Sequence, residues 1–540
     1  MDVKGYVVDI FKKRVFKGSI TIQNSKILAI REENTVPNVF IIPGFVDAHI
    51  HIESSLLPPS EFAKIAVRKG CIACICDPHE IANVVGMEGV DFMINNAKNV
   101  NFKFYFGAPP CVPATDLEDS GGKIGVQDIE TLLKRKEIKF LAEVMDFESV
   151  IQRREDIMRK ISFAKTLNKP IDGHAPGLRG EMLERYISAG ISTDHEVTDV
   201  EEAEEKIKKG MKVIIRYGSV SRDFDALSTL VERYPKSCMI GSDDKAPDDL
   251  EENYIDSAVK EGVRRKLSIF DFLWVTSVTP RLHYGIDIGL LRVGDPADFV
   301  IVENLEDLRV IATYIDGIPV FYEGCVKLDT ARSKIINNFQ ASKLTVDDIK
   351  VISMGQKIRV IETREKSLFT GASVETPRVQ GDLVVSDKER DILKVVLINR
   401  YKKNTKPVVG FLRGFGLKKG SMASSILHDS HHIIGLGCDD ISLVEAINEV
   451  IENEGGMVFV SSERKEVLPL PIGGLMSDLC YEEIVRKYRE LNRVVKESGI
   501  LFSYPFVNLS FVGLPVIPKL KITSRGLFDV NEQKLVELFL

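Results

Sequence analysis

Residues 41–55 read Ile-Ile-Pro-Gly-Phe-Val-Asp-Ala-His-Ile-His-Ile-Glu-Ser-Ser, a short apolar run that leads into polar residues at every second position. Side chains on a β-strand alternate between two faces, so we expect His49, His51 and Glu53 on one side. Two imidazoles and a carboxylate at a strand end are suitable ligands for a divalent metal. The alternative is a solvated face on an edge strand, but a buried strand needs partners for its polar groups. We therefore expect further ligands elsewhere in the chain.

The length and composition indicate a globular protein with several domains. The chain has 540 residues, too many for one hydrophobic core, so we expect two or three domains. The formal net charge is −7 and there is no basic stripe, so we expect no binding to nucleic acid. The sequence has no apolar stretch long enough to cross a membrane, and its start lacks the layout of a signal peptide. These features predict a cytoplasmic protein that does not bind membranes.

Residues 43–284 alternate between strand-like and helix-like patterns, which is typical of a parallel sheet. We expect the first strand to begin slightly earlier, and the eight predicted strands are 41–51, 70–77, 102–107, 138–144, 170–174, 191–195, 212–218 and 237–243. Predicted helices between them include 148–166. Eight strands in about 240 residues match a (β/α)8 TIM barrel. An open doubly wound sheet is the alternative, but the first βα turn has no glycine-rich phosphate loop.

The segments on either side of this region predict two further domains, so the predicted fold class is α/β with additions. Residues 1–42 and 285–335 contain short β-branched runs, and we expect them to form one small β-sandwich domain together. Asp316 and Gly317 lie between two such runs and are a hairpin signal. Residues 336–540 mix strand-like and helical runs, and we expect an additional α+β C-terminal domain there.

Five of the nine histidines fall at or just beyond the ends of predicted barrel strands, and these are His49, His51, His79, His174 and His195. Glu143 and Asp243 end two further strands. Barrel enzymes place their chemistry at the C-terminal ends of the strands. We predict a two-metal site that shares a bridging carboxylate, with the ligands His49, His51, Glu143, His174, His195 and Asp243. The alternative for Glu143 is a helix cap or an ion pair.

Several segments together resemble the amidohydrolase superfamily, namely 43–51, 279–281 and 289–298. Many members of that superfamily bridge their metals with a carboxylated lysine, where this chain has Glu143. The chain is most similar to the adenine deaminases of bacteria and archaea, in the segments 51–55, 77–83, 142–145, 172–176, 194–196, 242–245, 428–431 and 468–477. After His431, many adenine deaminases have Asn where this chain has His432.

The resemblance implies the hydrolysis of adenine to hypoxanthine and ammonia, in purine salvage, by attack of a metal-bound hydroxide on C6. It implies a binuclear Mn²⁺ site, with Fe²⁺ or Zn²⁺ as alternatives. Asp243 would pass the hydroxide proton to the departing amine. Glu53 would protonate N1 or, alternatively, orient a ligand histidine. His79, on the loop after the second strand, would polarise the hydroxide or contact the purine, with a loop cap as the alternative.

Other readings of the sequence stay open at this point. A different amidohydrolase would act on another nucleobase or a cyclic amide, whereas a scaffold protein that has lost its metal would lack the ligands found here. We expect His283 to be structural. His428, His431 and His432 either close over the barrel mouth or belong to the polar part of the third domain, and we favour the second. The cysteines at 71, 74 and 76 fit a buried strand, with an auxiliary metal or redox role as the alternative. We expect a homo-oligomer, a dimer or larger.

Overall fold

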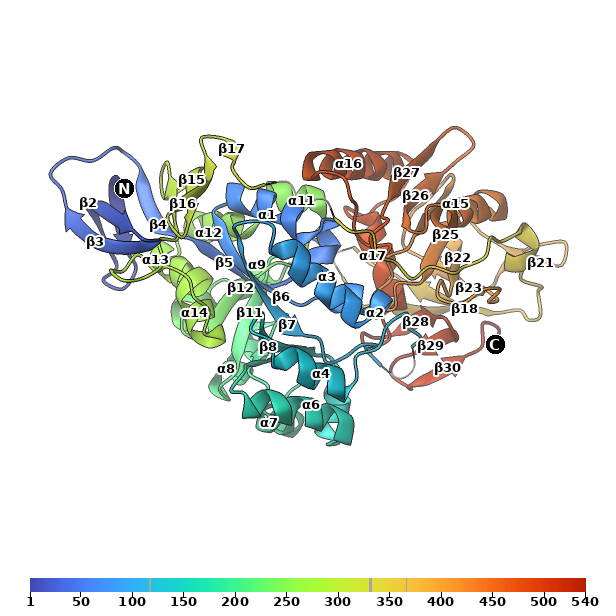
Figure 1. The fold of residues 1–540 in the computed structure, drawn as a ribbon. Coiled ribbons are helices and arrows are strands. Elements are labelled where there is room, and N and C mark those ends of the chain that lie inside the picture. Colours follow the sequence, from blue (N-terminus) through green and yellow to red (C-terminus); the bar gives the residue numbers. More distant parts are fainter. Residues whose placement is uncertain (116–117, 330–332, 366) are drawn as a thin grey trace.

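The computed structural model describes residues 1–115, 118–329, 333–365 and 367–540 (Figure 1). Its centre is a TIM-barrel-like domain of parallel strands, in a six-stranded sheet of order β13-β5-β6-β7-β8-β9 and a three-stranded sheet of order β10-β11-β12. The bounds of these strands are β5 (Phe45–His51), β6 (Cys71–Cys76), β7 (Lys103–Ala108), β8 (Ile138–Val144), β9 (Ile171–Gly173), β10 (Thr193–Asp194), β11 (Lys212–Arg216), β12 (Cys238–Gly241) and β13 (Asp243–Asp244).

Helices follow these strands along the chain, as the alternating sequence pattern predicts. Their bounds are α1 (Pro59–Arg68), α2 (His79–Val85), α3 (Met87–Ala97), α4 (Val126–Leu133), α5 (Phe147–Ile151), α6 (Glu155–Thr166), α7 (Gly180–Ala189), α8 (Val200–Lys208), α9 (Phe224–Leu227), α10 (Leu230–Arg233), α11 (Pro247–Glu252), α12 (Ile255–Arg264), α13 (Ile269–Leu273) and α14 (Thr279–Tyr284). The single helix predicted at 148–166 is wrong. It is divided into α5 and α6, because Arg153 between them has a positive φ of 58° that a continuous right-handed helix does not allow.

Strands β5 and β6 are buried along their whole length, which explains their nearly continuous apolar sequences. Cys71, Cys74 and Cys76 are buried in β6, as we expected. The single strand predicted at 41–51 is wrong, because the chain breaks at Gly44 into β4 (Phe40–Pro43) and β5. A Cβ atom at Gly44 would lie 2.4 Å from the side chain of Ile72, so only glycine lets the two strands meet at this point.

The segments before and after the barrel share one eight-stranded sheet of order β17-β16-β15-β14-β4-β1-β2-β3. The bounds are β1 (Asp2–Asp9), β2 (Arg14–Gln23), β3 (Lys26–Glu32), β14 (Phe299–Val302), β15 (Val310–Ile315), β16 (Ile318–Tyr322) and β17 (Cys325–Val326). Strand β4 joins the two halves, since it pairs with both β1 and β14. The hairpin signal is confirmed, because Asp316 and Gly317 turn β15 into β16 with positive φ angles at both residues.

The C-terminal part contains an eight-stranded sheet of order β19-β18-β23-β22-β25-β24-β26-β27, with helices α15 (Asp440–Glu452), α16 (Tyr481–Glu497) and α17 (Pro505–Ser510). The strand bounds are β18 (Ile358–Glu362), β19 (Gly371–Glu375), β22 (Ile392–Ile398), β23 (Val408–Arg413), β24 (Ser421–Ser424), β25 (Ile433–Gly437), β26 (Gly456–Val460) and β27 (Lys465–Pro469). Two small sheets contain β20 (Arg378–Gln380) with β21 (Leu383–Val385), and β28 (Leu520–Thr523), β29 (Gly526–Asp529) and β30 (Lys534–Val536).

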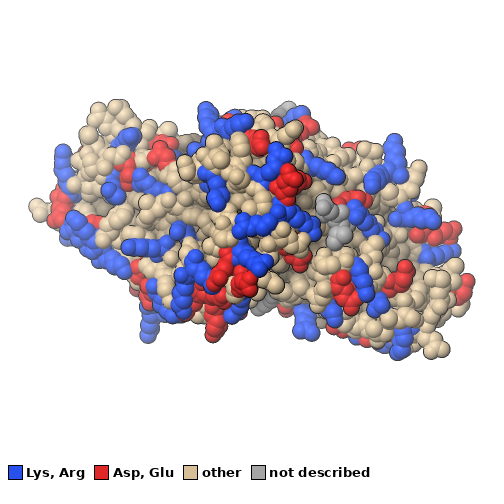
Figure 2. Space-filling model, turned by 90° about the horizontal axis from the view of Figure 1, so that it is seen from below, with Lys and Arg blue, Asp and Glu red and all other residues tan. Residues whose placement is uncertain are grey.

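The N-terminal sheet and the C-terminal part lie at opposite ends of the molecule, with the parallel strands between them (Figure 1). Basic and acidic side chains alternate over the face drawn in Figure 2, without a single-sign field. Among the described residues, every helix is too short or too polar to cross a membrane.

Candidate active site

The six residues predicted as metal ligands come from five neighbouring strand ends. His49 and His51 are on β5, and Glu143 is on β8. His174 is the first residue after β9, and His195 is the first residue after β10. Asp243 is the first residue of β13. All six side chains are buried. Because parallel strands end at one edge, residues far apart in the sequence meet here.

Glu143 lies at the centre of this group. Its Oε1 is 3.3 Å from Nε2 of His51, and its Oε2 is 2.7 Å from Nδ1 of His174 and 3.2 Å from Nε2 of His195. Burial alone would raise the pKa of the Glu143 carboxyl, but the surrounding histidines hold it well below its usual value. The ionised carboxylate thus faces imidazoles with both of its oxygens, which is the arrangement that a bridging ligand needs.

Asp243 forms the second carboxylate of the group. Its Oδ1 lies 3.3 Å from Nε2 of His51 and 3.8 Å from Nε2 of His49. Its Oδ2 lies 3.3 Å from Nη1 of Arg216, a buried guanidinium on β11 that also pairs with Glu196. The two oxygens therefore face different partners, one the histidines and the other a fixed cation.

These donor atoms fit divalent metal ions. The atoms of His49, His195 and Asp243 lie within 4.8 Å of one another, and so do those of Glu143, His174 and His195. Nε2 of His49 is buried and has no hydrogen-bond partner, although a buried nitrogen normally has one. Nitrogen and oxygen donors without thiolate suit Mn²⁺, Fe²⁺ or Zn²⁺.

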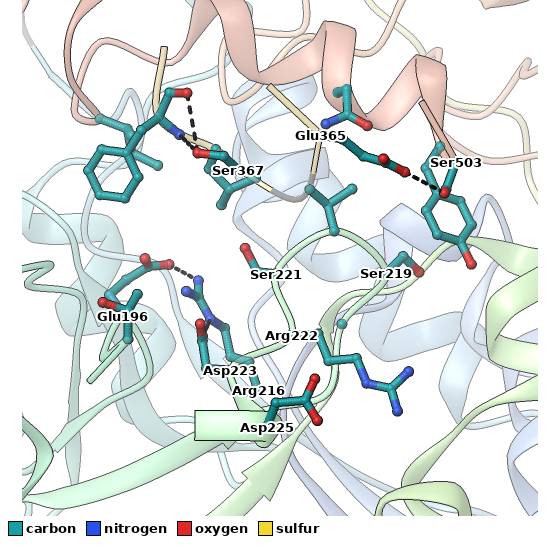
Figure 3. Close-up of a pocket in the computed structure, with 18 of the residues that line it drawn as sticks. Glu196, Arg216, Ser219, Ser221, Arg222, Asp223, Asp225, Glu365, Ser367 and Ser503 are labelled. Atoms are coloured by element: carbon teal, nitrogen blue, oxygen red, sulfur yellow. Dashed lines mark hydrogen bonds and ion pairs between the residues drawn. The ribbon is translucent and has the colours of Figure 1, made fainter. Parts of the chain in front are cut away.

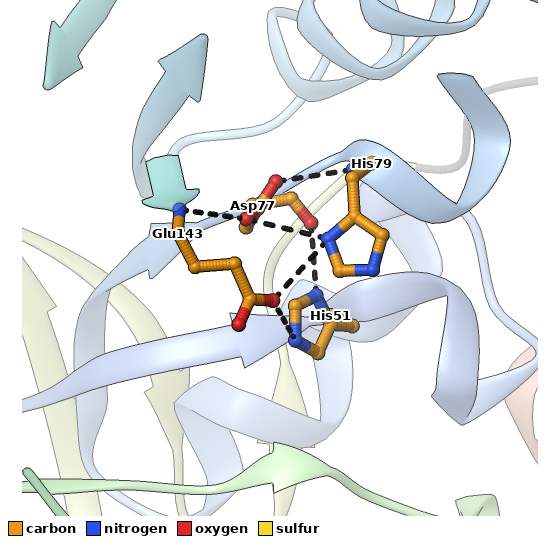
Figure 4. Close-up of side chains that lie close together, drawn as sticks. All are labelled: His51, Asp77, His79 and Glu143. Atoms are coloured by element: carbon orange, nitrogen blue, oxygen red, sulfur yellow. Dashed lines mark hydrogen bonds and ion pairs between the residues drawn. The ribbon is translucent and has the colours of Figure 1, made fainter. Parts of the chain in front are cut away.

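His79 lies beside this group, but its local structure differs from the prediction. It is the first residue of helix α2, not part of a loop, and Asp77 accepts a hydrogen bond of 3.1 Å from its backbone nitrogen. Its Nδ1 lies 3.3 Å from Oδ2 of Asp77 and 3.4 Å from Oε1 of Glu143 (Figure 4). The helix start therefore holds the imidazole against the carboxylate of Glu143.

Glu53 does not share a strand face with the histidines, so that prediction is wrong. Strand β5 ends at His51, and residues Ile52–Ser55 form one 3-10 turn. The Oε1 atom of Glu53 accepts a hydrogen bond of 3.2 Å from the backbone nitrogen of Ile81, and its Oε2 has no hydrogen-bond partner. Burial raises the pKa of this carboxyl to about 7. Glu53 thus contacts helix α2, the element that begins with His79.

Two histidines of the C-terminal part reach the barrel, which was the alternative that we did not favour. Nδ1 of His428 lies 2.7 Å from Oε1 of Glu80, and Nε2 of His431 contacts the other oxygen of Glu80. His432 instead packs against Tyr401, with ring centroids 5.3 Å apart. Our preference for the third domain therefore fits His432, whereas His428 and His431 face the barrel. Apart from the family-like segment 428–431, no local pattern indicated this contact.

Two cavities lie at the mouth of the barrel. The inner cavity has about 30 Å³, and both barrel residues such as His51 and C-terminal residues such as His428 line it. This volume has room for about two water molecules, less than a purine needs. An outer cavity of about 570 Å³ adjoins it and shares three lining residues, Glu196, Leu368 and Ile517 (Figure 3).

An apolar cluster separates the two cavities. It consists of Val220, Leu368, Phe511, Leu514 and Ile517, and all but Val220 belong to the C-terminal part. We call these four C-terminal side chains the roof, because they line the inner cavity together with the predicted metal ligands. The roof forms the apolar part of the inner cavity's lining, and a ligand as large as a purine would have to displace part of it.

Comparison with known proteins supports the resemblance found in the sequence, both for the barrel and for the C-terminal part. Residues 40–320 match the amidohydrolase family, and residues 367–534 match the adenine deaminase C-terminal domain. An adenine deaminase from Sulfurovum sp. is 46% identical over 98% of this chain and 98% of its own length. Adenine deaminases from Salinibacter ruber and Methanosarcina acetivorans are 43% and 44% identical, each over 99% of this chain and 98% and 99% of their own lengths. With barrel and C-terminal part both matched at this identity, the chain belongs to the adenine deaminase family of amidohydrolases.

Proposed function

We propose that this protein hydrolyses adenine to hypoxanthine and ammonia. The observation that carries the proposal is the buried cluster of four histidines and two carboxylates at the strand ends, in a chain of this family. A purine amine is a poor leaving group, so its replacement by water needs an activated nucleophile and a proton for the amine. The cluster offers both kinds of group in a buried site.

We propose that His49, His51, Glu143, His174, His195 and Asp243 hold two metal ions, with Glu143 as the shared carboxylate. Mn²⁺ is our choice, with Fe²⁺ and Zn²⁺ as alternatives that the same donors accept. When bound, such ions lower the pKa of a water and so supply the nucleophile for C6. The protein's part is to fix the donors, and the central position of Glu143 supports this role.

We assign the proton transfer at the nucleophile to Asp243. Its carboxylate takes the proton of the attacking water and delivers it to the amino group on C6, which then leaves as ammonia while the C–N bond breaks. The contact with Arg216 holds the carboxylate in one orientation during both transfers. The oxygen of the water stays on C6 of the product hypoxanthine.

We assign the protonation of N1 to Glu53 and a contact with the purine to His79. Glu53 is a buried carboxyl with one oxygen free of hydrogen bonds, next to the helix that begins with His79. It does not line the small inner cavity, so this role requires the purine to widen that cavity towards Ile81. His79 does line it and faces Glu143.

We also propose the finer architecture that the sequence predicted. Eight strands of residues 43–284 would close into one barrel, which is supported by the pairing of β13 with β5 and by a hydrogen bond of 2.9 Å from Ser192 N to Ile171 O across the gap between β9 and β10. Residues 1–42 and 285–335 would form the small β-sandwich domain, and residues 336–540 the third domain. A cytoplasmic homo-oligomer stays our expectation from the sequence.

The test is ammonia release from adenine by protein that has been stripped with a chelator and then supplied with Mn²⁺. We expect no release from the stripped protein and full release after Mn²⁺ is added. Guanine, cytosine and hydantoin in parallel test the alternative, an amidohydrolase for another nucleobase or a cyclic amide. Release from one of these but not from adenine would replace our proposal with that alternative.

A further inference from the structure

Glu80 is the point where the barrel and the C-terminal part meet in the inner cavity. Its side chain is 2% exposed, and both of its oxygens pair with histidines of the C-terminal loop, His428 and His431. Glu80 and His428 both line the inner cavity. The proposed chemistry uses neither residue, although a buried carboxylate at a cavity wall is costly unless it has a role or a firm partner.

Glu80 lies on the other side of the His79 imidazole from Glu143. The imidazole of His79 lies between two carboxylates, with Nδ1 3.4 Å from Oε1 of Glu143 and Nε2 3.5 Å from Oε1 of Glu80. Glu80 is therefore one imidazole ring further from Glu143 than His79 is. A flat bicyclic ligand with its amino end at Glu143 would extend along His79 and bring its other end to Glu80.

Adenine presents a hydrogen-bond donor at that other end. The five-membered ring of the free base carries one N–H, on N9 or N7, whereas a nucleoside has a sugar on N9. A carboxylate accepts such an N–H in a short charge-assisted hydrogen bond. From this geometry we propose that Glu80 accepts the ring N–H of the free base and thereby selects free adenine over N9-substituted adenines. This inference rests on the proposed function.

His428 is the positioning residue for Glu80 in this proposal. Its Nδ1 contacts Oε1 of Glu80, and its ring stacks on Phe511 with centroids 4.4 Å apart and an interplanar angle of 15°. Its backbone nitrogen donates a hydrogen bond of 3.1 Å to the carbonyl of Ser510. The imidazole is thus fixed within the C-terminal part, and through it that part sets the place of the carboxylate that reads the substrate.

The experiment compares adenine with 9-methyladenine, which keeps the amino end and lacks the N9–H. We expect the wild-type protein to prefer adenine by at least about 100-fold in kcat/KM, because a site built to hydrogen-bond a donor rejects analogues without it. In Glu80→Met, which keeps the length of the side chain, kcat/KM for adenine should fall about 100-fold while that for 9-methyladenine changes less than about threefold. In His428→Gln the preference should shrink about tenfold.

His432→Gln is the matched control, because His432 is a buried histidine of the same loop that does not line the cavity. It should leave the preference for adenine unchanged, and metal analysis should find the same content in every variant. Equal losses for both substrates in Glu80→Met would overturn the proposal. If that variant does not fold, an unchanged preference in His428→Gln overturns it instead. A wild-type protein that releases no ammonia from adenine would refute the proposed function rather than this inference.

Discussion

The barrel strand ends and the loop between β24 and β25 both supply buried histidines to one cavity, but they do so in different ways. In the barrel, the imidazoles of His49, His51, His174 and His195 surround carboxylates from other strand ends. In the loop, His428 and His431 reach across to Glu80, which lies outside their own part of the chain. In the proposed function the first set holds the metal ions, and the second shapes the space next to them.

This difference shows that residues can be brought together either within one sheet or by the docking of two parts of the chain. A parallel sheet places its strand ends at one edge, so its histidines meet as soon as the strands form. The loop histidines meet Glu80 only when two separately built parts dock. Changes in the first set should therefore affect chemistry, whereas changes in the second should affect selectivity and docking.

The largest effect should come from the centre of the barrel set. In Glu143→Gln we expect ammonia release from adenine to fall roughly 1,000-fold or more, because the amide is a poor bridging ligand for two metals. Metal analysis of the purified variant should show a lower metal content than in the wild type. A variant that keeps its metal would remove Glu143 from the ligand set and weaken the distinction between the two sets.

A smaller loss should follow at Glu53, the residue between the two sets. In Glu53→Gln we expect kcat to fall about 100-fold with both metals still bound, since an acid for N1 is worth about that factor. Steady-state kinetics with metal analysis measure both quantities. The glutamine oxygen can still accept the hydrogen bond from Ile81, so near-normal turnover would leave Glu53 with that anchoring role alone.

The packing of the roof within the C-terminal part is testable through stability. Lys521 is fully buried, and its Nζ donates to the carbonyls of two roof residues, Phe511 at 2.8 Å and Leu368 at 3.3 Å. Burial lowers the pKa of Lys521 from 10.5 to about 7. Between these values the unfolded chain binds a proton that the folded protein does not, so this residue makes the free energy of unfolding rise with pH.

In Lys521→Met this contribution should disappear, so the gain in Tm of the wild type between pH 7 and pH 9 should shrink. At pH 9 the variant should also be less stable by about 1–3 kcal/mol, because two buried carbonyls lose their donor. Thermal unfolding at both pH values measures this. An equal rise in Tm in the wild type and in Lys521→Met would show that Lys521 titrates as an exposed lysine does.

The smallest effect should come from a barrel histidine away from the strand ends. His283 is on α14, and its Nε2 lies 3.4 Å from the hydroxyl of Ser192. In His283→Gln we expect unchanged kcat/KM and a loss of stability below about 1 kcal/mol, since one weak hydrogen bond is affected. A large loss of activity would show that location in the barrel matters more than location at a strand end.

Much of the barrel was predictable because its information is local. The apolar run before His49 and the helix-like segments between strands identified the strand ends to within a few residues, and hence the six residues that the structure brings together. The strand break at Gly44 was missed because it depends on the side chain of Ile72 in another strand. The alternation rule failed for Glu53 because the strand ends two residues earlier.

The contribution of the C-terminal part was not predictable in the same way. Glu80 follows His79 in the sequence, but its partners are some 350 positions away, and only the docked structure selects His428 and His431 over His432. No periodicity in a segment encodes which other domain it will contact. The roof escaped prediction for the same reason, since its apolar residues look like ordinary core residues.

The eight-stranded sheet at the N-terminal end has a consequence for how the protein is made. Strand β4 pairs with β14, so Ile41 and Ile42 meet Ile301 and Val300. A ribosome makes the chain from its N-terminus, and the first of these partners emerges long before the second. During translation one edge of β4 therefore stays open, with unpaired backbone groups, until the whole barrel segment has been synthesised. The pairing of β14 with β4 can therefore form only after the whole barrel segment between them has been synthesised.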